Sequence, residues 1–179
     1  MKKKLLLLLL LLCVLFVSGC VGSDSPDTVQ VGDHVSVNYI GSLDDGTVFD
    51  TSIEEVAISE GIYNPGRNYE PLPFTVGAGQ MIKGFDDAVI GMSVGENRTV
   101  ILLPQEAYGE VSEDYIITYS MDDFTSVNIT PVIGEKITSQ GHAGTIINVS
   151  EDMVIVDFNH HLAGKNLTFF IELVSIDRS

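Results

Sequence analysis

The chain has 179 residues, of which 45% are hydrophobic and 19% are charged, a balance typical of a globular protein with one domain or two small ones. It carries 9 basic and 25 acidic side chains, a net charge of −16. An acidic surface of this kind repels nucleic acid and anionic headgroups, so nucleic acid is excluded as an expected partner.

The first twenty residues have the pattern of an export signal. Lys2–Lys4 form a basic region, Leu5–Val17 an apolar region too short to span a bilayer, and Val17–Cys20 a small-residue cleavage site. Cysteine directly after the cleavage point is typical of lipoproteins, which are anchored by acyl chains. We therefore predict a signal peptide over residues 1–19 and a tether over 20–28 with lipid on Cys20. An uncleaved anchor helix, or a chance cysteine, is the alternative.

This processing would place the folded part outside the cell, anchored to the outer face of the cell membrane. Cys13 would leave with the signal and Cys20 would carry lipid, and the sequence has no other cysteine. We therefore expect neither a disulfide nor thiol chemistry in the folded part.

The folded part begins with a predicted β-hairpin. Apolar and polar residues alternate over His34–Ile40, the pattern of a half-buried strand. Asp44-Asp45-Gly46 supplies a left-handed turn residue, and Val48–Asp50 starts the return strand.

A helical excursion is predicted next, over residues 52–60. Ser52 and Glu55 have the spacing of a capping box, and Gly61 ends the apolar face. Turns rich in proline and glycine then lead to an extended segment at residues 72–76.

A short amphipathic helix and a strand follow. Phe85, Val89 and Met92 line one helical face, with Gly84 before the helix, so the helix should lie across the sheet. Residues 99–103 form a nearly continuous apolar run, which predicts a strand buried on both sides and ended by Pro104.

The last third of the chain has the pattern of a small all-β lobe. We expect β structure at 115–119, a helical turn at 120–124, an extended segment at 127–131, and strands at 136–139, 143–149 and 153–158. Residues 167–176 then alternate, with Phe169, Ile171, Leu173 and Ser175 on one side. We predict that this last strand returns to the first sheet, which makes the lobe an insertion.

Several motifs together resemble the FKBP family of peptidyl-prolyl isomerases. The insertion, which closes with Asp157–Leu167, is similar to the SlyD-type subfamily with its insert-in-flap chaperone domain, and the excursion near residues 52–69 resembles the longer archaeal members. The motifs occur in the family's order: Val37–Gly41, Asp45–Asp50, Val76-Gly77, Met81–Phe85, Met92–Glu96 and Ala107–Gly109.

The resemblance implies an α+β fold, in which an antiparallel sheet wraps on a short helix beside a small all-β insert-in-flap domain. The isomerase domain would comprise residues 29–109 and 159–179, and the insert residues 110–158. Carried over by position, Asp50 and Tyr108 would be catalytic. Phe85 and Leu72 stand where eukaryotic members have tryptophan and another aromatic residue. Substrate would be bound by Tyr39, Phe49, Leu72, Met81, Ile82, Phe85 and Phe169.

The implied activity is cis-trans isomerisation of X-Pro bonds in exported proteins, with chaperone activity from the insert. The expected partners are unfolded or proline-containing polypeptides, the membrane through the lipid anchor, and no second copy of the chain. The reaction makes no bond to hydrogen or oxygen, so no cofactor is expected. Two alternatives are a holdase chaperone lipoprotein with little isomerase activity and a surface lipoprotein that binds a small ligand.

Two further patterns have weaker implications. His160 and His161, with His142, suggest a metal site, but no spaced carboxylate or cysteine set accompanies them, so no metal is predicted. Four N-glycosylation sequons, whose use depends on the host, begin at Asn97, Asn128, Asn148 and Asn166.

Overall fold

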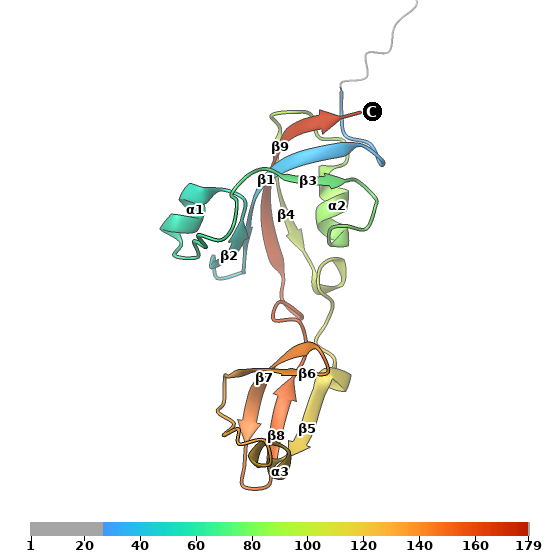
Figure 1. Cartoon of the computed structure of the whole chain (residues 1–179). Coiled ribbons are helices and arrows are strands. Elements are labelled where there is room, and N and C mark those ends of the chain that lie inside the picture. The colour runs from blue at the N-terminus through green and yellow to red at the C-terminus, as the bar shows by residue number, and fades with distance from the viewer. Residues whose placement is uncertain (1–26, 179) are drawn as a thin grey trace, which may run out of the picture.

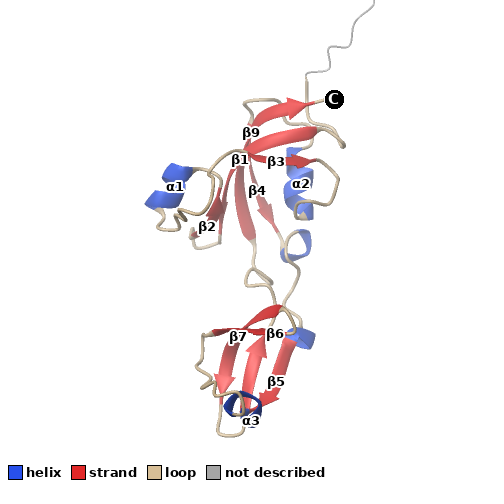
Figure 2. Ribbon diagram, in the orientation of Figure 1, coloured by secondary structure: helices blue, strands red, loops and turns tan. Residues whose placement is uncertain are grey.

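The computed structural model describes residues 27–178, which form two lobes, each built on an antiparallel sheet (Figures 1 and 2). The predicted signal peptide and Cys20 lie outside the described residues. Within residues 27–178, no helix has the length and apolar character needed to cross a membrane. The sheets and few short helices confirm the predicted α+β class.

The sheet of the first lobe is assembled from distant parts of the chain. Its strand order is β2-β1-β9-β4, and β3 also pairs with β1. The pairing of β9 with β1 and β4 confirms that the last strand returns to the first sheet. The strands are β1 (His34–Ser42), β2 (Val48–Thr51), β3 (Leu72–Thr75), β4 (Asn97–Leu102) and β9 (Leu167–Asp177).

Strand β1 is the centre of this sheet. Val35, Val37 and Tyr39 are buried in alternation, as the sequence pattern predicts. Gly46 adopts the predicted left-handed conformation (φ 86°) in the turn to β2.

A β-bulge in β9 changes the predicted facing of its end. Leu173 pairs with Val37, but Ser175 pairs with Ser36, so Val174 is the extra residue. Beyond the bulge, Ile176 packs against the core in place of Ser175. The prediction that Ser175 shares the face of Leu173 is therefore wrong.

Helix α2 (Lys83–Val89) lies against the sheet and supplies the first lobe's core with Phe85 and Val89 (Figure 1). The prediction placed Gly84 before the helix and is wrong, because Gly84 is the second residue of α2. A Cβ atom on Gly84 would come 2.5 Å from Leu102 Cδ2, so only glycine allows this approach of α2 to β4.

Strand β4 is buried on one side only, which contradicts the prediction of burial on both. Leu102 is buried, whereas 66% of the Ile101 surface is exposed. The prediction fails because α2 covers only one face of β4, and the apolar side chains on the other face are exposed. The strand ends at Leu102, and Pro104 begins the 3₁₀ helix η1 (Pro104–Glu106).

Helix α1 (Glu54–Ser59) is present, but the predicted capping box is absent from it. Ile53 is the N-cap residue, and the hydroxyl of Ser52 accepts a hydrogen bond from the backbone N–H of Tyr39 at 2.9 Å. The Ser52 hydroxyl thus accepts from a backbone N–H of strand β1 rather than from one at the start of the helix.

The second lobe, which we call the insert lobe, has a four-stranded sheet of order β5-β8-β7-β6. Its core consists of Phe124, Ile146, Val154 and Val156. The predicted strands and helical turn are confirmed, but residues 127–131 form no regular extended segment: Val127 and Asn128 lie in a turn, with Asn128 left-handed (φ 58°), and residues 129–131 have no regular secondary structure. The elements are η2 (Glu113–Tyr115), β5 (Ile116–Ser120), α3 (Met121–Thr125), β6 (Lys136–Ser139), β7 (His142–Val149) and β8 (Met153–Asp157).

Two chain segments connect the lobes and are bonded to each other. Asn159 exchanges hydrogen bonds with the backbone of Ser112, and the Gly164 N–H donates to the Gly109 carbonyl at 2.8 Å. At the opposite end of the first lobe, Arg178 binds Asp33 and the start of the described chain at Asp27 and Thr28.

Candidate active site

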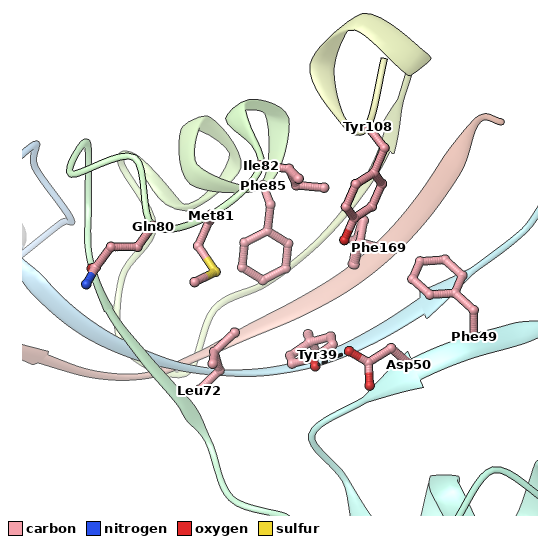
Figure 3. A pocket seen from close by; sticks show the side chains of 10 residues that line it. All are labelled: Tyr39, Phe49, Asp50, Leu72, Gln80, Met81, Ile82, Phe85, Tyr108 and Phe169. Carbon is pink, nitrogen blue, oxygen red and sulfur yellow. Dashed lines mark hydrogen bonds between the residues drawn. The ribbon is translucent and has the colours of Figure 1, made fainter. Parts of the chain in front are cut away.

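A cavity of about 440 Å³ lies between the sheet of the first lobe, the segment leading into α2, and the segment after η1 (Figure 3). The structure brings all nine sequence-predicted pocket residues together here. It adds Gln80, which the sequence analysis missed because Gln80 belongs to no periodic pattern. The lining residues are Tyr39, Phe49, Asp50, Leu72, Gln80, Met81, Ile82, Phe85, Tyr108 and Phe169.

Aromatic rings form the floor and one wall of the cavity. Phe85 projects from α2 and meets Phe169 of β9 edge to face, with ring centroids 5.2 Å apart. Phe85 also meets Tyr39 of β1 at 5.8 Å, and Phe49 meets Phe169 at 5.7 Å. Interlocked T-shaped pairs of this kind fix ring positions, so the apolar surface is preformed.

The polar edge of the cavity is a network of three side chains. The Tyr39 hydroxyl donates to Asp50 Oδ2 at 2.6 Å (Figure 3). The Arg67 guanidinium donates to the Tyr39 hydroxyl at 2.8 Å and pairs with Asp50 through its other amino group. Burial and the bond to Asp50 raise the pKa of Tyr39 to about 12, so its phenol stays neutral. Partial burial alone lowers the pKa of Arg67, but its bonds to Asp50 and Tyr39 raise it overall.

Arg67 is a site residue that the sequence analysis missed. It lies in the excursion between β2 and β3, after the turn at Asn64, and sequence patterns there indicated only a loop. One signal was available, because no other lysine or arginine occurs between Lys4 and Lys83.

Tyr108 brings a second hydroxyl to the cavity from the segment after η1. Its side chain extends toward Phe169 in Figure 3, and the residue is 39% exposed. Burial, and then the charge of Asp50, raise the pKa of Tyr108, which keeps this hydroxyl protonated and able to donate.

Two of the three histidines that suggested a metal site, His160 and His161, pack with other rings. His160 stacks on Tyr108, and the His160 and His161 rings lie 4.6 Å apart. Among residues 27–178, no group of three or more histidine, cysteine, aspartate or glutamate side chains is arranged to hold a metal ion.

A second cavity, of about 340 Å³, lies on the insert lobe. Its wall combines the aromatic rings of Tyr115, Tyr119 and Phe158 with polar side chains, and apolar side chains such as Val127, Val132 and Ile133 are exposed elsewhere on this lobe. The cavity is lined by Asp114, Tyr115, Ile117, Tyr119, Ser139, Gln140, His142 and Phe158.

Comparisons with known proteins agree with this geometry. The family described as FKBP-type peptidyl-prolyl cis-trans isomerase matches residues 25–174. A short-type peptidyl-prolyl cis-trans isomerase of Methanocaldococcus jannaschii is 46% identical over 145 residues, which cover 81% of this chain and 92% of the relative.

Two bacterial relatives are more distant. The FKBP-type isomerase SlyD of Helicobacter pylori is 31% identical over 72% of this chain and 70% of its own length. An FKBP-type 16 kDa isomerase of Escherichia coli is 31% identical over 84% of this chain and 95% of its own length. The chain therefore belongs to the family of FKBP-type peptidyl-prolyl cis-trans isomerases and is an isomerase enzyme.

Proposed function

We propose that the 440 Å³ cavity isomerises X-Pro bonds of exported polypeptides, which the insert lobe captures in unfolded form. The observation that supports the first part best is the preformed aromatic cavity with two protonated hydroxyls and a carboxylate at its edge. A proline ring is an apolar group that such a cavity can enclose.

The cavity suits the chemistry of amide rotation. The barrier to rotation is about 18 to 20 kcal/mol because amide resonance is lost at the perpendicular geometry. The twisted amide has less charge separation than the planar one, so an apolar site that excludes water favours the twisted state. Neither a nucleophile nor an acid-base pair is required.

The polar groups have complementary roles in this proposal. Tyr108, whose phenol is neutral at pH 7 and whose pKa is raised further, donates its hydroxyl to a carbonyl of the bound peptide. Asp50, held by Tyr39 and Arg67, presents a fixed carboxylate at the edge where the carbonyl of the rotating amide turns. Stabilisation of about 8 kcal/mol in total would place the enzyme at the low end of known rate enhancements.

The insert lobe would act as the chaperone part. Its cavity has aromatic and aliphatic walls formed by Tyr115, Ile117, Tyr119 and Phe158, which suit apolar side chains of an unfolded chain. Folded clients bury such side chains, so this surface would select unfolded ones. The two connecting segments would keep a captured chain close to the isomerase cavity.

The site of action in this proposal is outside the cell, at the outer face of the membrane. The basic, apolar and small-residue regions that end at Cys20 support export and lipid attachment. The net charge of −16 argues against nucleic acid as a partner. We propose that the enzyme works as a monomer on newly exported, proline-containing polypeptides.

A holdase with little isomerase activity is the second candidate, and the exposed apolar surface of the insert lobe favours it. NMR exchange measurements of a short Ala-Pro peptide, with residues 21–179, separate the two. We expect acceleration that Tyr108→Phe and Asp50→Ala reduce, with client binding unchanged. Absence of acceleration by the unaltered protein would leave the holdase as the function.

The insert lobe is tested on a folding protein limited by proline isomerisation. We expect Ile117→Ser, and replacement of residues 110–158 by a short loop, to slow catalysed refolding of the protein substrate while the Ala-Pro peptide is still isomerised. Equal losses on both substrates would remove the chaperone part of the proposal.

A further inference from the structure

The excursion between β2 and β3 carries a pair of tyrosines that no role in the pocket has yet explained. The rings of Tyr63 and Tyr69 are stacked, with centroids 5.5 Å apart and planes at 16°. The guanidinium carbon of Arg67 lies 5.4 Å from the centroid of the Tyr69 ring, within the range of a cation–π contact. The stack therefore ends on the cation that binds Asp50.

Tyr69 also contacts the turn that carries Arg67. The Asn64 side chain accepts from the Gly66 N–H at 2.9 Å, and the Asn64 carbonyl accepts from the Arg67 N–H at 3.1 Å. The hydroxyl of Tyr69 accepts from the Asn64 N–H at 2.9 Å. One tyrosine thus holds both the backbone turn before Arg67 and the end of the Arg67 side chain.

Arg67 needs such support to act as a rigid partner. Its side chain is 38% exposed, and that of Asp50 is 40% exposed. An exposed ion pair is weak because ordering the long side chains costs entropy and water screens the charges. Aromatic contact with a guanidinium reduces the number of orientations the side chain can sample, and Arg67 must hold Asp50 and Tyr39 at once.

We propose that Tyr69, backed by Tyr63, is a positioning residue for isomerisation. It holds the Arg67 guanidinium where it fixes the Asp50 carboxylate and the Tyr39 hydroxyl at the cavity edge. This inference rests on the role proposed above for that edge. Tyr69 itself does not line the cavity, so it acts through Arg67 and not on the substrate.

The test measures kcat/KM for a short Ala-Pro peptide, beginning with the unaltered protein. Tyr69→Leu removes the aromatic face and is expected to lower kcat/KM by about two- to fivefold, the range of a cation–π contact at a partly exposed site. Tyr69→Phe keeps the face and is expected to retain most of the activity. Ile58→Ala, on the exposed side of α1 in the same excursion, is the matched control and should have no effect.

A double-mutant cycle separates positioning from a general structural role. If Tyr69 acts through Arg67, Tyr69→Leu causes no further loss in an Arg67→Ala background. Tyr63→Leu, which removes only the backing ring, gives a smaller loss with the same dependence on Arg67 and serves if Tyr69→Leu does not fold.

Equal losses with and without Arg67, or full activity of Tyr69→Leu and Tyr63→Leu, would overturn the inference. A Tyr69→Phe variant as impaired as Tyr69→Leu would overturn it too, because the ring face would then be irrelevant. An inactive unaltered protein would instead refute the proposed function, so the two failures are distinguishable.

Discussion

The ring of Tyr108 lies flat on the imidazole of His160, with centroids 3.9 Å apart and planes within 6° of parallel. Tyr108 precedes the insert lobe in the chain, and His160 follows it. The stack therefore joins the two connecting segments at the point where one of them supplies a hydroxyl to the cavity. A residue of the cavity wall is thus held by a residue that comes after the insertion.

We predict that His160→Ala lowers kcat/KM on an Ala-Pro peptide by about two- to tenfold, because loss of an aromatic pair frees the Tyr108 ring. His160→Phe should retain the activity, since it preserves a flat ring. Peptide exchange measured by NMR gives both values. An unimpaired His160→Ala variant would show that the stack does not position Tyr108.

The same histidine should make stability depend on acidity. Burial, and then the charge of His161, lower the pKa of His160 below its ordinary 6.5, so folding favours the neutral ring. The resulting stabilisation is complete above pH 6.5 and is lost as pH falls through the lower folded-state pKa. Between pH 6.5 and that lower pKa, the free energy of unfolding should fall more steeply for the unaltered protein than for His160→Phe. Urea titrations at several pH values would compare them, and equal slopes would contradict the prediction.

Tyr39 should produce an alkaline limb in the curve of stability against pH, in which the free energy of unfolding falls as pH rises. Its pKa rises from 10 to about 12 on folding, so its stabilisation is complete below pH 10 and is lost as pH rises toward 12. Tyr39→Phe should flatten that limb and, at neutral pH, cost about 1 to 2 kcal/mol through the lost hydrogen bonds. Tyr115→Phe, at an exposed tyrosine, is the control and should retain the limb.

Gly84→Ala tests the close approach of α2 to β4. The new Cβ would lie 2.5 Å from Leu102 Cδ2, so we expect a loss of about 1 to 3 kcal/mol by overpacking. Alanine otherwise favours a helix over glycine, so the sign of the effect is diagnostic. A higher urea midpoint of unfolding for Gly84→Ala would show that α2 can move away from β4 without loss of stability. Lys83→Ala, at an exposed position of α2, is the control.

Neighbouring residues of β4 should differ sharply in their effect on stability. Leu102→Ala empties a buried site and should cost about 2 to 5 kcal/mol. Ile101→Ala changes a side chain that is 66% exposed and should alter stability by less than about 0.5 kcal/mol. Comparable losses at both positions would mean that the outer face of β4 is covered in solution.

Local patterns predicted the elements of this fold better than the contacts between them. Alternation located β1 and β9, because each has one face against the core. It failed at Val174, where a bulge reverses the facing. The apolar run over residues 99–103 predicted burial on both sides of β4 and was wrong at Ile101, which is exposed. Ser52 had the spacing of a helix cap, but the nearby backbone of Tyr39 binds its hydroxyl.

In the candidate site, too, residues within local motifs were predicted and contacts between distant residues were not. The family resemblance indicated the nine cavity residues: seven of them lie within the motif runs, and Leu72 and Phe169 were carried over by their position in the chain. Arg67 and His160 were not assigned to the site because their partners are distant in the chain: Arg67 binds Asp50 from 17 residues away, and His160 reaches Tyr108 across the insertion. Contacts of this kind depend on the folded path and leave no local pattern.

If Cys20 carries a lipid as proposed, the bonds of Arg178 to Asp27 and Thr28 would influence which end of the enzyme faces the membrane. They fix the start of the described chain at the end of the first lobe that is farthest from the insert lobe (Figure 1). A lipid on Cys20 would lie seven residues before Asp27, a span of at most about 25 Å when fully extended. The insert lobe would then point away from the bilayer, where it could contact a polypeptide in the surrounding solution (Figure 1).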